Sequence, residues 1–153
     1  MKLFTGIDLS LSSSAIITLN DKAEIVEETI IKTKATTDIE PRLISIRDNI
    51  QEILSKEKIE IIYLEGLSFG SHGKIAELGA LHYLIRILLY KYINFKVIPP
   101  TTLKKFVIKG NAKKELMLKE VFKQWGYDTD SNDLCDAYAL ARMAIHEFNE
   151  NHG

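Results

Sequence analysis

The sequence predicts an α/β fold: a mixed five-stranded sheet with helices on both faces. Three observations predict it, namely three consecutive short runs rich in β-branched residues, two later strand-like runs that each follow a helical segment, and a helical final third. Consecutive short strands favour antiparallel hairpins, whereas a strand reached through a helix favours a right-handed crossover and parallel pairing. We therefore expect both kinds of pairing within one sheet.

The expected strands are bounded by turn-forming residues. Serines separate the first strand from the second, and Asn20-Asp21 separates the second from the third. The fourth strand ends at Glu65 and is continuously apolar, a pattern typical of a strand buried on both faces. The fifth ends before Pro99 and Pro100. The expected strands are 3–8, 13–19, 24–31, 59–65 and 95–98.

The helices follow from the spacing of apolar residues. The first is amphipathic and runs from near Pro41 to about Glu57. The second, 74–92, is apolar over most of its circumference, so it packs on more than one side. It is either a central core helix or an interface with a second copy of the chain, through Leu81, Leu84, Ile85 and Leu88. Further helices are expected at 101–107, at 112–125 and from about Ser131 onward.

Length and composition favour one compact unit. With 153 residues, 46% of them apolar, we expect a single domain spanning residues 1–153. No apolar run is long enough to span a bilayer and the start lacks a signal-peptide pattern, so we expect a cytoplasmic protein with no membrane partner. The single cysteine, Cys135, cannot form an internal disulfide and is interpreted as a packing residue. The four histidines show no metal-ligand spacing.

The net charge of −1 hides two segments of opposite sign. Residues 86–123 contain ten lysines and arginines against two glutamates, whereas the last thirty residues contain six acids against Arg142. A basic segment of this kind indicates a nucleic-acid surface, and the alternative is a set of solvated helix faces.

Four acids lie where the expected elements begin or end. Asp8 closes the first strand, Glu65 closes the fourth, and Asp133 and Asp136 share one face of the terminal helix. Buried carboxylates need a compensating charge or hydrogen bonds. If the two strands are neighbours, the acids converge at one sheet edge, where an oxygen-only cluster favours Mg²⁺ or Mn²⁺ over zinc.

Each acid also has a purely structural interpretation. Asp8 could form a turn, Glu65 could end an exposed strand, and Asp133 could be a first-turn acid in a helix capped by Asp130. Four acids at three element ends favour a cation site over these separate explanations.

These motifs resemble those of a known family. G-I-D at 6–8, L-E-G at 64–66 and D-L-C-D-A-Y-A-L-A at 133–141 are similar to the acidic tetrad of RuvC-type Holliday junction resolvases, which have the ribonuclease H (RNase H) fold. S-F-G-S-H-G-K-I-A-E-L-G-A-L resembles the family's loop and following helix, with Phe69 in the place of an aromatic that inserts among bases. V-I-P-P-T-T-L-K-K-F-V-I-K-G-N-A-K-K-E-L resembles its lysine helix and Gly-rich turn.

The chain also departs from the family pattern. Leu9 and Ser10 follow the first aspartate, where cellular members commonly have proline and glycine. The Gly-x-Gly turn is shortened at 110–112, so Lys113 competes with Lys114 for the place of the active-site lysine. The trimmed pattern resembles the phage-borne branch, which would place the protein in the cytoplasm of a bacterial host.

The resemblance implies an RNase H-like, structure-selective nuclease that cuts four-way junctions and other branched DNA by paired nicks and leaves 5′-phosphate and 3′-hydroxyl ends. Two Mg²⁺ ions per site, or Mn²⁺, would be held by Asp8, Glu65, Asp133 and Asp136, with Lys114 as a further catalytic residue. The twofold symmetry of the junction favours a homodimer, and the need for a helicase partner is open. The expected DNA contacts are Phe69, Lys104, Lys105, Lys109, Lys113 and Lys114.

Two other functions fit parts of the pattern. The segment GIDLSLSSS also suits the phosphate loop of actin-like and sugar-kinase ATPases, which close two such domains around ATP, whereas this chain has the length of one. A non-catalytic protein that binds branched DNA would use its lysines for phosphate contacts and its acids only structurally. The first predicts a magnesium-dependent ATP site, and the second predicts that D8N leaves the behaviour on junctions unchanged.

Overall fold

The computed structural model describes residues 1–67, 75–108 and 114–152. Its sheet has the strand order β3-β2-β1-β4-β5. β2 pairs antiparallel with both β1 and β3, whereas β4 pairs parallel with both β1 and β5. The predicted mixed five-stranded sheet is confirmed. The strands are β1 (Leu3–Asp8), β2 (Ser13–Asn20), β3 (Ile25–Lys32), β4 (Ile61–Glu65) and β5 (Phe95–Ile98).

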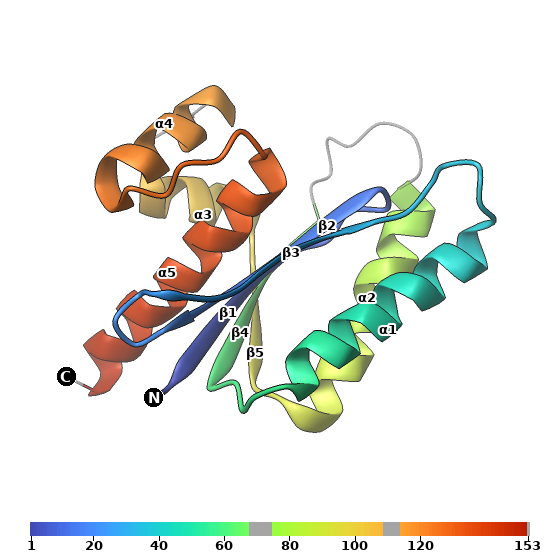
Figure 1. Ribbon diagram of the computed structural model, residues 1–153, viewed down its shortest axis with the longest axis horizontal. Coiled ribbons are helices and arrows are strands. Elements are labelled where there is room, and N and C mark those ends of the chain that lie inside the picture. Colours follow the sequence, from blue (N-terminus) through green and yellow to red (C-terminus); the bar gives the residue numbers. More distant parts are fainter. Residues whose placement is uncertain (68–74, 109–113, 153) are drawn as a thin grey trace.

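Helices cover both faces of the sheet, as predicted (Figure 1). α1 and α2 lie on one face, and α3, α4 and α5 lie on the other. None of the helices in the described ranges is both long and apolar enough to cross a bilayer. The helices are α1 (Ile39–Ser55), α2 (Ile75–Tyr92), α3 (Pro100–Val107), α4 (Lys114–Trp125) and α5 (Asn132–His152).

Two hydrophobic cores flank the sheet, and the alternation of side chains along each strand decides which core a residue enters. Phe4 of β1 and Tyr63 of β4 belong to the core beneath α5. Because side chains two residues apart point to the same face, Asp8 and Glu65 are also placed on the α5 side. Both acids stand at the last position of their strand.

α5 packs directly against the backbone of β1 because Gly6 has no side chain. A Cβ atom at this position would lie 2.0 Å from the carbonyl oxygen of Ala137 and 2.8 Å from the backbone nitrogen of Ala141. Only glycine permits so close an approach between the strand and the helix. The contact brings the helical turn that carries Asp136 to the end of β1, where Asp8 lies.

The surface of α2 differs from the predicted interface. Leu81 and Ile85 are fully buried in the core beneath α1 and α2, so these two residues fit the alternative of a core helix. The exposed apolar residues of α2 instead include Tyr83, Ile87 and Tyr90, which recur at helical spacing. One side of α2 packs against the sheet, so the apolar residues on its other side remain exposed to solvent.

Candidate active site

The parallel register of β1 and β4 places two carboxyl groups side by side. Ile7 pairs with Leu64, so Asp8 and Glu65 are the next residues of the two neighbouring strands. Asp136 reaches the same place from the second turn of α5. One carboxylate oxygen from each of these three acids lies within 4.8 Å of the other two. The structure thus gathers three of the four predicted acids into one cluster.

The fourth acid, Asp133, lies beside the cluster and has a different partner. It lines the same cleft, but its Oδ2 atom accepts a hydrogen bond from Ser13 Oγ at 2.6 Å. α5 is capped by Ser131, whose hydroxyl oxygen accepts from the backbone N–H of Leu134 at 3.1 Å. The alternative of a cap at Asp130 is therefore wrong.

Burial and mutual repulsion act together on Asp8. The residue is 8% exposed, and burial is the largest cause that raises the pKa of Asp8 well above its usual value. The charges of Glu65, Asp136 and Asp133, followed by a hydrogen bond with Glu65, raise this pKa further. A carboxyl group in such surroundings keeps its proton unless a cation takes the place of that proton.

The chemistry of the donors fits a hard divalent cation. The cluster offers carboxylate oxygens, which suit Mg²⁺ or Mn²⁺. Cys135 lies between Asp133 and Asp136 in the sequence, but burial raises the pKa of its thiol to about 12, so it supplies no thiolate at neutral pH. Its burial in the core beneath α5 agrees with the packing role expected from the sequence.

The acids open onto a cleft of about 410 Å³. His82 of α2 and Lys104 of α3 line its wall, together with Met117 of α4. His82 is buried, and desolvation followed by the charge of Arg86 lowers its pKa to about 4, so its imidazole is neutral at neutral pH. Sequence reasoning missed His82 because a single histidine on an apolar helix has no spacing that would reveal it.

The predicted DNA contacts divide into three groups. Lys104 lines the cleft, and Lys105 is exposed on α3. Lys96, which belongs to the basic segment but not to these predicted contacts, donates a hydrogen bond to Glu147 at 3.2 Å. The expected contacts that lie outside the described residues are Phe69, Lys109, Lys113 and the side chain of Lys114.

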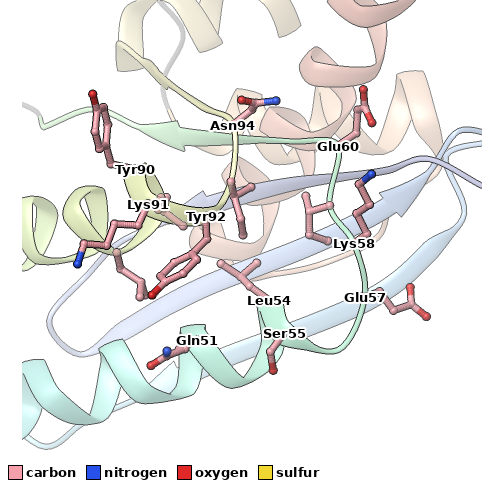
Figure 2. Close-up of a pocket in the computed structure, with 14 residues that line it drawn as sticks. Gln51, Leu54, Ser55, Glu57, Lys58, Glu60, Tyr90, Lys91, Tyr92 and Asn94 are labelled. Carbon is pink, nitrogen blue, oxygen red and sulfur yellow. The ribbon is translucent and has the colours of Figure 1, made fainter.

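A larger hollow of about 820 Å³ lies at the opposite end of the sheet (Figure 2). It is formed where α1 and α2 end and β4 begins, and Tyr92 extends from α2 toward α1 there. Glu57 and Glu60 line it, but the acids of the cluster do not. The converging carboxylates therefore do not lie in the larger of these two hollows.

Solved structures similar to this chain include several Holliday junction resolvases. Thermus thermophilus RuvC has a TM-score of 0.80 at 18% sequence identity, covering 99% of this chain and 96% of the RuvC chain. The fowlpox virus resolvase in complex with Holliday junction DNA has a TM-score of 0.61 at 15% identity, covering 95% and 98%. The yeast mitochondrial resolvase Ydc2 has a TM-score of 0.60 at 14% identity, covering 97% and 83%. No protein-family model and no curated protein sequence matches the chain.

These similarities define the class of fold. The chain has the RNase H-like fold of RuvC, with the expected sheet and with helices on both faces. T. thermophilus RuvC has also been solved with a Holliday junction substrate, and that complex gives the same TM-score of 0.80. At these sequence identities the similarity establishes the fold, and function has to be argued from the site.

Proposed function

We propose that this chain is a divalent-cation-dependent endonuclease that resolves four-way DNA junctions. The observation that carries the proposal is the convergence of Asp8, Glu65 and Asp136 within 4.8 Å of one another at the end of a buried strand. Such a cluster is unfavourable without a cation, and strongly perturbed acids in a cleft are typical of functional sites. The fold shared with junction resolvases supports this choice of substrate by analogy.

The residues of the cleft suggest a division of tasks. Bound divalent cations would activate a water molecule and stabilise the leaving oxygen of the phosphodiester. Asp8 is the ligand that we expect to be shared between two ions, because all three other acids act on it. Lys104 on the cleft wall would hold a phosphate oxygen, and Lys114, the first residue of α4, is the second candidate for this contact. Cleavage would leave 5′-phosphate and 3′-hydroxyl ends.

We further propose that the protein acts as a homodimer. A four-way junction has twofold symmetry, and resolution requires two symmetrical nicks, which two identical sites would supply. The apolar stripe on α2, defined as Tyr83, Ile87 and Tyr90, is the candidate interface. Exposed basic residues outside the cleft would contact the arms through their phosphates, namely Lys105, Lys119 and Lys123.

The test is cleavage of an end-labelled four-way junction with Mg²⁺ or Mn²⁺. D8N and E65Q should each lower the nicking rate by about 100-fold or more, because each removes a negative ligand from the cluster, while junction binding in a gel-shift assay is retained. D21N makes the same chemical change in the exposed turn after β2 and should cut like the wild type.

Two results would contradict the proposal. Undiminished cutting by D8N would show that the cluster does not catalyse the reaction. A wild-type protein that binds junctions but cuts none with either metal would favour the non-catalytic alternative, in which the acids are structural.

A further inference from the structure

The turn between β1 and β2, residues 9–12, is held closed by its own serines. The backbone N–H of Ser10 donates to Ser14 Oγ at 3.0 Å, and this hydroxyl donates to the carbonyl oxygen of Ser10 at 2.6 Å. The backbone N–H groups of Ser12 and Ser13 both donate to Ser10 Oγ, at 3.3 and 3.4 Å. Local hydrogen bonds of this kind favour one loop conformation. The turn therefore delivers Ser13 to a defined place.

A buried arginine of α1 fixes the same turn from outside. Arg42 is 3% exposed, and its guanidinium donates to the carbonyl oxygen of Leu11 at 3.0 Å and to Ser12 Oγ at 3.3 Å. It also donates to Thr33 Oγ1 at 2.9 Å, directly after β3. The backbone N–H of Thr33 in turn donates to the carbonyl oxygen of Ser12 at 3.1 Å. Because a buried cation needs its hydrogen bonds, this arrangement ties α1, the end of β3 and the turn together.

Ser13 connects this assembly to the fourth acid of the site. Its hydroxyl donates to Asp133 Oδ2 at 2.6 Å, joining residues 120 positions apart in the sequence. Asp133 lines the cleft without belonging to the three carboxylates that lie within 4.8 Å of one another. A hydrogen bond to a charged carboxylate is stronger than one between neutral groups. The hydroxyl therefore fixes one carboxylate oxygen of Asp133.

We infer that Ser13 is a positioning residue for Asp133 and that it divides the acids into two unequal cation positions. Asp8, Glu65 and Asp136 form the tighter position, because three carboxylates converge there. Asp133, held at one oxygen by Ser13, completes a second and weaker position. This inference rests on the proposed function, since it assigns separate roles to ligands of the same site.

The experiment is a calorimetric titration of the full chain with Mn²⁺ alone, repeated by electron paramagnetic resonance to count bound ions. The wild type should show two classes of Mn²⁺ site. S13A should weaken the lower-affinity class by about 10–100-fold, the usual effect of removing a group that orients a metal ligand, and should leave the tighter class within about twofold. S13T keeps the hydroxyl and should restore the weaker class.

Cleavage supplies an independent readout. The Mg²⁺ concentration that gives half-maximal nicking should rise in S13A, and the rate at saturating Mg²⁺ should approach that of the wild type. A general fault in folding would instead lower the rate at every concentration. S55A removes an exposed hydroxyl at the end of α1, which lines the hollow at the opposite end of the sheet from the acids, and should match the wild type in both assays.

Each remaining outcome is decisive. If S13A titrates with Mn²⁺ like the wild type, or loses both classes equally, the inference fails while the proposed nuclease function stands. If S13T behaves like S13A, the hydroxyl is not the group that matters, and the inference also fails. If the wild type binds no Mn²⁺, the proposed function and the inference fail together.

Discussion

Two buried ionisable residues, Arg42 and Asp8, have different roles in this protein. Arg42 is almost fully buried, and it donates hydrogen bonds to neutral oxygens that fix a turn. Burial, and then the charges of the neighbouring acids, raise the pKa of Asp8 well above its usual value. The first arrangement contributes to a defined loop, whereas the second lowers the stability of the cation-free protein. Such a loss of stability is common where a site is built for binding or catalysis.

His82 offers a test of the cleft wall by pH. Its pKa in the folded protein is lowered to about 4 from 6.5, first by burial and then by Arg86. Between these values the unfolded chain takes up a proton that the folded protein does not, so His82 destabilises the protein as the pH falls. H82Q lacks this group. The wild type should therefore lose about 1–3 kcal/mol of unfolding free energy relative to H82Q between pH 7 and pH 4.5.

Urea unfolding of metal-free protein at the two pH values measures this difference. H146Q makes the same change on the exposed side of α5 and should follow the wild type. A gap between the wild type and H82Q that is constant over this range would mean that His82 is not shielded from water as the structure indicates.

Asp8 and Glu65 could be selected as candidates from the sequence because a charge at the end of an apolar strand is conspicuous. Asp133 and Asp136 could be selected because their spacing of three places them on one face of a helix. Ser13 could not be predicted, because it is one of three consecutive serines. Only the pairing of β2 and the position of α5 decide which of these serines contacts Asp133. The contact joins residues 120 positions apart, and no local pattern carries that information. Residues that act through a long-range hydrogen bond are thus the part of this site that requires a structure.

At the scale of elements, the site depends on how closely α5 approaches β1. Asp136 and Asp8 belong to different elements, and the missing side chain at Gly6 lets these two elements touch. The elements themselves could be predicted, because strand and helix periods differ and Gly, Pro, Asn and Ser mark the breaks. The exposed face of α2 could not be predicted, because the sequence of a helix that is apolar on most sides does not reveal which side the sheet covers.

G6A tests this approach. The added Cβ would lie 2.0 Å from the carbonyl oxygen of Ala137, so α5 has to move away from β1. We expect G6A to lose about 3 kcal/mol or more of unfolding free energy, and the displaced Asp136 to weaken Mn²⁺ binding. Urea unfolding and calorimetry measure the two effects.

G79A is the matched control for this substitution. Gly79 lies within α2, and among the described residues a Cβ added there would have no heavy atom within 4 Å apart from its chain neighbours and the backbone of its own helix. The same change should therefore stabilise the protein by about 0.5–1 kcal/mol. Similar stabilities of G6A and G79A would contradict the close contact between β1 and α5.

At the scale of the whole molecule, the acidic cluster and the candidate interface are distinct features. The acids lie at the carboxyl ends of β1 and β4, whereas Tyr83, Ile87 and Tyr90 lie along the exposed side of α2. α2 also supplies His82 to the cleft wall, so one helix carries both features. A dimer formed through this helix would therefore hold two copies of the acidic cluster at a fixed separation.

I87E tests this arrangement, because Ile87 is 63% exposed in the middle of the stripe. A twofold interface would contain the new carboxylate twice, once from each protomer, and each copy would be buried without a partner, so we expect dimerisation to weaken by about 30-fold or more in sedimentation velocity. I44E makes the same substitution at an isoleucine of α1 that is 47% exposed, and this variant should remain dimeric.

The cutting of a plasmid with an extruded cruciform tests whether paired nicks depend on the same face. On this substrate, the wild type and I44E should yield linear DNA by coupled cuts. I87E should accumulate nicked circles, because the two sites no longer act in one complex. Linear product from I87E at the rate of I44E would show that paired cutting does not depend on this face of α2.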